Sequence, residues 1–244
     1  MILRSDYRPS DFLLDRIELR VQIEALTTVE TTLHLRRNPL GSSAAPLRLE
    51  GREMELLQLE LDGKPLANPD YRVEPSALIV ESVPDRFVLR SVTRIDPEKN
   101  TALEGWYRSG PMLCTQCEAQ GFSRITYSLD RPDVLAPYRV RLEADASRYP
   151  VLLANGDCVE SGPLPGGRHF ATWEDPHPKP AYLFAMVAGD LACVEGRHRR
   201  ASGREVALKF YVDRGNEDRV GHAMQSLQKA MAWDEAVYGL EYDL

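Results

Sequence analysis

Apolar and polar residues alternate along most of the first 190 residues. The segments IELRVQIEA (17–25) and TTVETTLHLRR (27–37) place an apolar side chain at nearly every second position. Because successive side chains of a strand point to opposite faces, this alternation predicts strands with one face buried and the other in solvent. Turn residues separate further predicted strands, which are LRLEG (47–51), LQLELDGKPL (57–66), YRVEPSALIV (71–80) and RFVLRSVTRI (86–95).

The same pattern continues to about residue 190. YRVRLEADASRYPVLLANGD (138–157) predicts two strands ending at Asn155-Gly156, and AYLFAMVAGDLACVEG (181–196) predicts a buried strand reaching Gly189. The intervening residues 158–180, rich in Gly, Pro and His, predict a hairpin and an ordered loop. No segment before residue 190 has the periodicity of a long helix. Many short strands joined by turns predict a mainly β, antiparallel sandwich or saddle-like sheet.

The pattern changes after about residue 190. Two further strands are predicted at ACVEGRH (192–198) and EVALKFYVD (205–213), followed by an amphipathic helix near 217–238. Asn216 is its expected N-cap and Gly239 its C′ residue. The predicted apolar stripe, expected to face a core, consists of Val220, Ala223, Met224, Leu227, Ala230, Met231 and Val237.

This change predicts two domains, a β-domain over 1–190 and the start of a second, truncated domain over 191–244. The helix ends close to Leu244, so the partners of its apolar stripe are expected in sequence beyond that residue. We therefore expect the chain to cover the stripe by self-association, or to leave residues 191–244 mobile.

Composition excludes several kinds of partner. The 244 residues are 43% hydrophobic with a net charge of −7, and they contain no run of eighteen apolar residues. Proteins that bind phosphate backbones concentrate Lys and Arg, and membrane-spanning helices need long apolar runs. The start of the sequence also lacks the pattern of a secretory signal. These observations predict a soluble, cytoplasmic protein with no nucleic-acid or membrane partner.

One closely spaced cysteine pair, Cys114-x-x-Cys117, offers candidate chemistry. A zinc site, a redox pair and an accidental spacing are the alternatives, and the five histidines lie too far apart in sequence to supply a second ligand pair. If residues 113–118 are extended, Cys114 and Cys117 face opposite ways, which predicts neither a shared metal nor a disulfide between them. The same parity brings Gln116 and Glu118 to one face.

Other sequence motifs of catalysis are absent. The sequence contains no GxGxxG or GxxxxGK[ST] phosphate loop, no GxSxG nucleophile elbow and no HExxH zinc helix. Scattered Ser, His and Asp residues do not define a triad.

The motif Thr115-Gln-Cys-Glu-Ala-Gln-Gly-Phe122, followed by Asp130-Arg-Pro-Asp133, resembles the amino-terminal domain of the bacterial aminopeptidase N family, zinc-dependent alanyl aminopeptidases of the gluzincin class. The similarity extends to YRPSDFLLDRIEL near the start, and to YLFAMVAGDL, SGREVALKFYVDRGN and AMQSLQKAMAWDEAVYGLEYDL downstream. Gln120 and Ser123 stand where related sequences often carry Glu and Arg, and we expect little consequence.

This resemblance implies roles for two residues. Glu118 would bind the substrate's free α-amino group, and Gln116 would line the pocket for the first side chain. A protonated amine is the feature that an internal peptide bond lacks, so a carboxylate suits its recognition. The resemblance also implies that the zinc ligands, the general-base Glu and an oxyanion-stabilising Tyr lie beyond Leu244, so that no metal ligand or catalytic group belongs to this chain.

The expected fold is thus an antiparallel β-domain followed by the first strands and helix of a truncated thermolysin-like catalytic domain. The expected function belongs to a longer enzyme that removes amino-terminal residues from peptides, with zinc as its cofactor and peptides with a free amino terminus as its substrates. The alternative is a stand-alone β-sandwich binding module of the same ancestry without peptidase activity.

Overall fold

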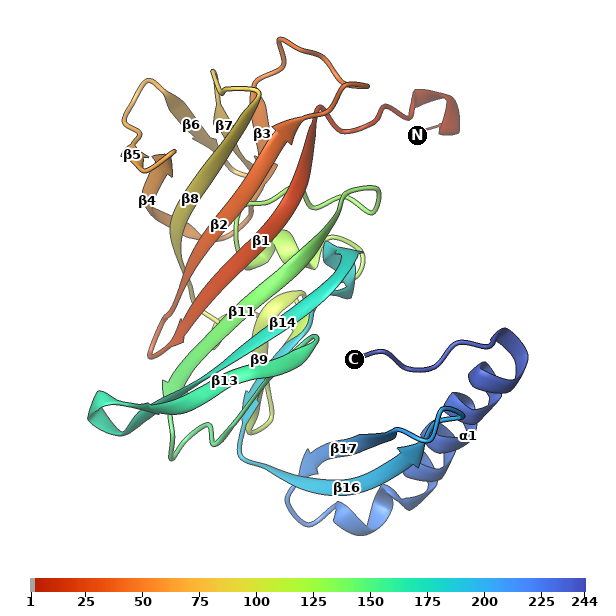
Figure 1. The fold of residues 1–244 in the computed structure, drawn as a ribbon. Coiled ribbons are helices and arrows are strands. Elements are labelled where there is room, and N and C mark those ends of the chain that lie inside the picture. The colour runs from red at the N-terminus through yellow and green to blue at the C-terminus, as the bar shows by residue number, and fades with distance from the viewer. Residues whose placement is uncertain (1–2) are drawn as a thin grey trace. The chain divides into compact units, whose positions relative to one another are not determined.

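The structure, a computed structural model, describes residues 3–244 (Figure 1). The chain divides into two compact units, of which the first ends at Ala188 and the second begins at Gly189. The sequence pattern predicted a change near residue 190. The assignment of the two units to a β-domain and to the start of a second domain stays a prediction.

An eight-stranded sheet forms the larger layer of the first unit (Figure 1). Its strands, in spatial order, are β13 (Asp157–Leu164), β14 (Arg168–Pro180), β11 (Leu135–Asp145), β1 (Phe12–Ile23), β2 (Thr27–Arg37), β8 (Arg86–Ile95), β4 (Glu55–Leu61) and β5 (Lys64–Pro65). The mainly β fold class is confirmed. The sheet is not purely antiparallel, however, because β1 and β11 run parallel. The long connection between these two strands allows β11 to enter beside β1 in the same direction.

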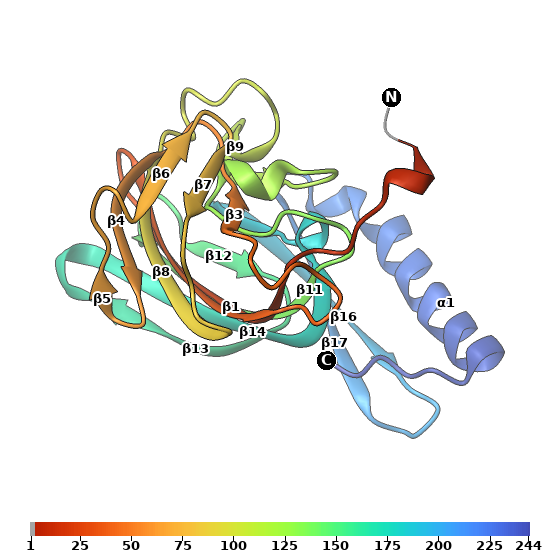
Figure 2. The same cartoon turned by 90° about the horizontal axis from the view of Figure 1, so that it is seen from above.

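Two smaller sheets lie over one face of this curved sheet, as the view from above shows (Figure 2). One has the order β12 (Val151–Ala154), β15 (Met186–Gly189), β10 (Met112–Gln116) and β9 (Gly105–Ser109). The other has the order β3 (Leu47–Glu50), β7 (Ala77–Val80) and β6 (Tyr71–Glu74). The first unit is therefore layered, with its core between the large sheet and the smaller ones.

The alternation in the sequence explains which face of the large sheet is buried. Every second residue of β2 and β8 is buried, and the residues between them are partly or fully exposed. On the inner face the largest fully buried aliphatic side chains of these strands are Leu33, Leu35 and Leu89. The outer face carries ion pairs between neighbouring strands, such as Arg90 with Glu30 at 2.8 Å.

Several predicted boundaries differ from the structure. YRVEPSALIV forms two strands, β6 and β7, because the chain turns at Pro75-Ser76. The predicted strand from residue 181 begins as the 3₁₀ turn η4 (Ala181–Leu183), and only Met186–Gly189 is extended. The segment 158–180 forms a long hairpin through the 3₁₀ turn η3 (Pro165–Gly167). Strand β9 was not predicted.

The second unit contains the hairpin β16 (Leu191–Arg199) and β17 (Glu205–Asp213), the 3₁₀ turn η5 (Glu217–Arg219) and the helix α1 (Gly221–Tyr238). The predicted helix is confirmed, and Gly239 ends it in the left-handed conformation. The α-helix begins five residues after Asn216, because the 3₁₀ turn and Val220 intervene, so the predicted N-cap is wrong.

The apolar stripe of α1 does not face a core, contrary to the prediction. None of the residues 221–238 is buried, and Leu227, Ala230 and Val237 are exposed. Ala223, Met224 and Met231 are half-buried, and only Val220, just before the helix, is buried.

Candidate functional site

The candidate site begins where β10 leaves its sheet. β10 pairs with β9 over its whole length, ending with Gln116 opposite Gly105. On its other side β10 pairs with β15 only at Leu113 and Cys114. The chain then turns through residues 118–120 into the 3₁₀ turn η2 (Gly121–Arg124). The strand therefore delivers the Gln116–Glu118 segment to the end of a sheet, which is a common location for binding residues.

The two cysteines of the CxxC motif are free thiols in different environments. Cys114 is half-buried on β10, whereas Cys117 is only 3% exposed. Burial, together with the nearby carboxylate of Asp130, raises the pKa of the Cys117 thiol far above its ordinary value. Cys117 is thus a packed, uncharged residue beneath the turn.

The strand that was predicted over 113–118 ends at Gln116, so the parity argument does not reach Glu118. Glu118 lies in the turn, and its peptide bond to Ala119 is cis. The structure still brings the two predicted site residues together, because the Gln116 side-chain amide donates a hydrogen bond to the Glu118 carbonyl at 3.3 Å. Both side chains are exposed.

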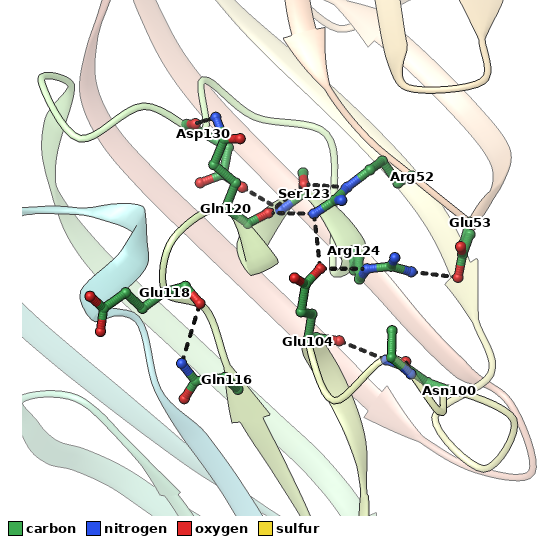
Figure 3. Close-up of polar contacts among 11 residues, drawn as sticks. Arg52, Glu53, Asn100, Glu104, Gln116, Glu118, Gln120, Ser123, Arg124 and Asp130 are labelled. Atoms are coloured by element: carbon green, nitrogen blue, oxygen red, sulfur yellow. Dashed lines mark hydrogen bonds and ion pairs between the residues drawn. The ribbon is translucent and has the colours of Figure 1, made fainter. Parts of the chain in front are cut away.

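The Glu118 carboxylate is directed away from the polar network that surrounds the turn (Figure 3). Within residues 3–244 no side chain or backbone group forms a hydrogen bond or ion pair with this carboxylate. It is an exposed acceptor on a turn that is held at both ends by hydrogen bonds. Such a group can accept hydrogen bonds from a cationic ligand without breaking a contact of the protein.

Glycine is required at the base of the turn because two backbone segments approach closely there. A Cβ atom on Gly121 would lie 2.3 Å from the carbonyl oxygen of Gln116 and 3.0 Å from the amide nitrogen of Gly105. The Gly121 amide donates to the Cys117 carbonyl at 2.7 Å, which closes the turn. The turn carrying Glu118 is therefore packed directly on the β9–β10 hairpin.

A buried carboxylate holds the far side of the turn. Asp130 is 1% exposed, and its Oδ2 accepts a hydrogen bond from the Ser123 amide at 2.8 Å. Its carbonyl oxygen accepts one from Gln120 Nε2 at 3.3 Å (Figure 3). Burial raises the pKa of Asp130 to about 6, although the hydrogen bonds from Ser123 oppose this shift and the nearby charge of Glu50 adds to it.

Arg52 contacts the same turn from the segment that follows β3. Its Nη2 donates to the Gln120 carbonyl at 2.8 Å, and its Nε donates to Ser123 Oγ at 3.1 Å. Its backbone amide also donates to the Ser123 carbonyl at 2.8 Å. Gln120 and Ser123, where this chain departs from the family pattern, thus make the contacts that join the turn to Arg52 and Asp130.

The network extends from Arg52 into a chain of alternating charges (Figure 3). Glu104 accepts hydrogen bonds from Arg52 at 3.3 Å and from Arg124 at 3.1 Å, and Arg124 also pairs with Glu53 at 2.5 Å. Asn100 donates to the Glu104 carbonyl at 2.8 Å. These contacts hold η2 and the start of β9 to the segment after β3.

Aromatic packing supports the turn from below. Phe122 is fully buried and makes edge-to-face contacts with Phe184, at a centroid distance of 5.0 Å, and with Tyr138, at 6.0 Å. Burial is the largest cause of a strongly raised pKa for the Tyr138 phenol, which stays uncharged. The candidate site thus lies on a well-packed part of the first unit.

Sequence reasoning missed Arg52 as a contributor to this site. It lies more than sixty residues before the motif and belongs to no recognisable pattern. Asp130 is part of the Asp130-Arg-Pro-Asp133 motif, which was used for the resemblance but was given no role.

No metal centre is identified in the part of the chain that the structure describes. Residues 3–244 contain no group of three or more His, Cys, Asp or Glu side chains arranged to hold a metal ion. The side chains at the candidate site accordingly do not form a zinc site. Among the same residues, no helix combines the length and apolar character needed to cross a membrane.

Comparison with known proteins relates the chain to aminopeptidases. Residues 92–183 match the Peptidase M1 N-terminal domain family. The chain is 48% identical to aminopeptidase N of Escherichia coli over 241 residues, which are 99% of this chain and 27% of that protein. It is also 48% identical to aminopeptidase N of Caulobacter vibrioides and 45% identical to that of Haemophilus influenzae, covering 28% of each. The chain therefore spans little more than a quarter of the length of these relatives.

Solved structures agree with this relationship. Legionella pneumophila aminopeptidase A, solved in complex with aspartic acid, matches 98% of this chain with a TM-score of 0.93 and 33% identity, and the match covers 28% of that protein. An M1 zinc metallopeptidase of Deinococcus radiodurans, solved with a bound Tyr-Ser-Ala substrate, shares the fold at 16% identity and a TM-score of 0.71. The resemblance to the amino-terminal part of bacterial aminopeptidase N is confirmed.

Proposed function

We propose that this chain, similar over nearly its whole length to the amino-terminal part of bacterial aminopeptidase N, supplies part of the substrate-binding cleft of a zinc-dependent aminopeptidase. The support is the identity of 48% to aminopeptidase N across 99% of the chain, together with the fold shared with aminopeptidase A. Because the chain spans about 27% of these relatives, the activity belongs to a longer protein that contains it.

Glu118 is the residue that we propose binds the α-amino group of the substrate. The observation that carries this proposal is the exposed Glu118 carboxylate, which has no partner within residues 3–244, on a turn that is otherwise fixed by hydrogen bonds. An unperturbed α-amino group has a pKa of about 7.7–8.0 and is mostly protonated at neutral pH. A hydrogen bond between this ammonium and a carboxylate contributes about 1.5–3 kcal/mol.

Gln116 has two roles in this proposal. Its side-chain amide holds the Glu118 carbonyl, and its exposed position beside Glu118 would place it against the first side chain of a bound peptide. An exopeptidase must recognise the end of a chain, so its amine-binding group and its first pocket need to be adjacent. The end of β10 supplies both from one short segment.

The chemical step is proposed to occur on residues outside this chain. A related M1 metallopeptidase is a zinc enzyme, and residues 3–244 contain no group of side chains arranged to hold a metal ion. We therefore propose that the zinc ligands and the general base lie in the remainder of the longer protein. Within this chain the residues at the site bind and orient the amine. We further propose a reducing, cytoplasmic compartment, because all four cysteines are free thiols.

The test is Glu118→Gln in the complete aminopeptidase that contains this chain. Glutamine keeps the shape and some hydrogen bonding but removes the charge, so kcat/KM is expected to fall about ten- to 150-fold. A rise in KM would mean that the contact acts equally in the ground and transition states, and a fall in kcat would mean that it aligns the scissile bond.

Glu160→Gln provides the matched control, because Glu160 is an exposed glutamate on the edge strand β13. We expect this variant to retain wild-type kinetics. Unchanged kinetics in Glu118→Gln on several aminoacyl substrates would show that the amine is recognised elsewhere.

A further inference from the structure

We infer that Asp130 and Arg52 act together as a clamp that fixes the direction of Glu118, which makes Asp130 a positioning residue for amine recognition. The inference rests on the proposed function. It concerns residues outside the Gln-x-Glu segment, which contact Gln120 and Ser123.

The first step concerns what holds the Glu118 turn. Inside the turn, the Gln116 side chain holds the Glu118 carbonyl at 3.3 Å and the Gly121 amide holds the Cys117 carbonyl at 2.7 Å. The Glu118 side chain itself forms no hydrogen bond or ion pair within residues 3–244. The direction of the carboxylate therefore depends on where the two ends of the turn are fixed. β10 fixes the end at Gln116.

The second step concerns the other end of the turn, at Gln120 and Ser123. Asp130 takes hydrogen bonds from both residues, through its carboxylate from the Ser123 amide at 2.8 Å and through its carbonyl from Gln120 Nε2 at 3.3 Å. Arg52 donates to both residues, to the Gln120 carbonyl at 2.8 Å and to Ser123 Oγ at 3.1 Å. Each of the two turn residues is thus held from two sides (Figure 3).

The third step concerns what holds the clamp. The Asp130 amide donates to Glu50 Oε2 at 3.2 Å, and the backbones of Glu50 and Ser128 exchange hydrogen bonds at 2.8 and 3.1 Å. Arg52 follows Glu50 by two residues and is also paired with Glu104 at 3.3 Å. The clamp is therefore anchored on β3 and on the start of β9, which are parts of the packed first unit.

The burial of Asp130 indicates that its hydrogen bonds are a specific part of the packed structure and not an incidental surface contact. Its side chain is almost completely enclosed, and a buried carboxylate is costly unless its hydrogen bonds are satisfied. Removing it would leave the Ser123 amide without its acceptor, and η2 would lose one of the contacts that fix it. A misplacement of about 1 Å can strongly weaken the interaction of a positioned group with its substrate. A shift of η2 should therefore weaken the binding of the substrate amine by Glu118.

The experiment compares Asp130→Ala with Asp130→Asn in the complete enzyme. Asparagine keeps an acceptor for the Ser123 amide, whereas alanine does not. The readout is the ratio of inhibition constants for leucine hydroxamate and 4-methylpentanohydroxamate, which differ only in the α-amino group. This ratio measures amine recognition, and it does not change when part of the enzyme is merely unfolded.

We expect the preference for the amine to fall about tenfold in Asp130→Ala, and to stay near the wild-type value in Asp130→Asn. Glu143→Ala is the control for a structural effect, because Glu143 is an equally buried carboxylate on β11 that is paired with Arg20 and Arg141. Its loss should lower stability and leave the inhibitor ratio unchanged.

Glu118→Gln in the same assay separates the two hypotheses. If Glu118→Gln leaves the ratio unchanged, the proposed function of Glu118 is wrong. If Glu118→Gln lowers the ratio and Asp130→Ala does not, the clamp is refuted while the proposed function stands. If Asp130→Ala yields no folded protein, Arg52→Gln, which removes the guanidinium contacts to Gln120 and Ser123, carries the same expectation and the same refutation.

Discussion

The two units of the chain are stabilised in different ways. Every member of the buried hydrophobic cluster belongs to the first unit, from Phe12 to Ala188. In the second unit the helix α1 has no buried residue, and polar contacts tie it to the hairpin. These contacts include His198 with Glu235 at 2.9 Å, the Ala201 amide with Glu235 at 2.9 Å, and Gln228 with the Arg197 carbonyl at 2.8 Å.

This difference indicates where the chain can hold a site rigidly. Hydrophobic burial supplies most of the free energy of folding, at about 25 cal/mol per Å² of apolar surface, whereas an exposed ion pair adds about 0–1 kcal/mol. The candidate site lies on the unit that has the core. The segment 189–244 is expected to open locally at a lower free energy than the sheets of the first unit.

The largest expected effect is a loss of core packing beneath the site. Phe122→Ala removes a fully buried ring that contacts Tyr138 and Phe184, so we expect a destabilisation of about 3–5 kcal/mol. The corresponding change in the second unit, Met224→Ala, removes a half-buried side chain packed on Gly196, and it should cost much less.

Tryptophan fluorescence can assign the two changes to their units. Trp106 and Trp173 lie in the first unit and Trp233 in the second, so Trp233→Phe leaves a signal from the first unit alone. In urea unfolding of that background, Phe122→Ala should shift the midpoint strongly and Met224→Ala hardly at all. Equal shifts for the two variants would contradict the difference in stabilisation between the units.

The second expected effect depends on pH and concerns Asp130. Its pKa is about 6 in the folded protein because of burial, with Glu50 and Arg52 as the nearby charges, against about 3.9 in an unfolded chain. A raised pKa contributes stability that is fully present below pH 4 and is lost as the pH rises through 6. The difference of about two between the folded-state and unfolded-state pKa values corresponds to about 3 kcal/mol. The stability of the wild type relative to Asp130→Asn should therefore fall by up to that amount between pH 4 and 7.

Glu143 provides a control of opposite sign. Burial alone would raise the pKa of Glu143, but hydrogen bonds from Arg20 and Arg141 outweigh it and lower the pKa to about 2. A lowered pKa contributes stability that is present above about pH 4.3 and lost as the pH falls toward 2. The difference between wild type and Glu143→Gln should therefore be flat from pH 5 to 7, where the Asp130→Asn difference changes. Parallel curves for the two variants would show that the Asp130 carboxylate is not the group that titrates.

A smaller effect is expected from crowding the backbone at the turn. In Gly121→Ala the new methyl would lie 2.3 Å from the Gln116 carbonyl oxygen, so the β9–β10 hairpin or the turn must shift, at a cost of about 1–3 kcal/mol. Gly110→Ala is the matched control, because Gly110 lies at the other end of the same hairpin with φ of 56° and nothing within 4 Å of a new Cβ. Its cost is that of the left-handed conformation alone, about 1–2 kcal/mol. A smaller loss at Gly121 than at Gly110 in thermal unfolding would mean that the close approach does not constrain the turn.

Alternation was sufficient to predict most of the strands of the large sheet. β1, β2 and β8 each bury one face, so a period of two is visible in the sequence, and the confirmed helix has an equally clear period. Pairing was not predictable in the same way. The parallel contact of β1 with β11 joins residues more than a hundred positions apart, and β9 shows no alternation because its first two residues, Gly105 and Trp106, are both buried.

The candidate site was also only partly predictable from the sequence. The resemblance identified Gln116 and Glu118, and a hydrogen bond joins the Gln116 side chain to the Glu118 carbonyl, but the roles of both residues stay predictions. Strand parity failed at Glu118 because the chain leaves the sheet after Gln116. Arg52 could not have been found from the sequence, since an arginine two residues after a strand carries no signal until the fold brings it to Gln120 and Ser123.

The smallest expected effect concerns the exposed face of α1. Leu227 is 38% exposed, and an exposed substitution away from special features usually changes stability by no more than about 0.5 kcal/mol. Leu227→Gln should therefore leave the unfolding of the isolated 244-residue chain unchanged, followed by the Trp233 signal. Residues 221–238 should also exchange amide hydrogens faster than β2 and β8, because no buried residue of the helix has to be exposed when it opens.

If instead Leu227→Gln costs more than about 1.5 kcal/mol, another surface covers this face of α1, and the sequence suggests that a second copy of the chain does so. Sedimentation at several protein concentrations distinguishes these cases. A dimer that dissociates in Leu227→Gln would show that self-association buries the apolar stripe. A monomer with slow amide exchange in α1 would show that the second unit is more stable than the lack of buried residues in its helix implies.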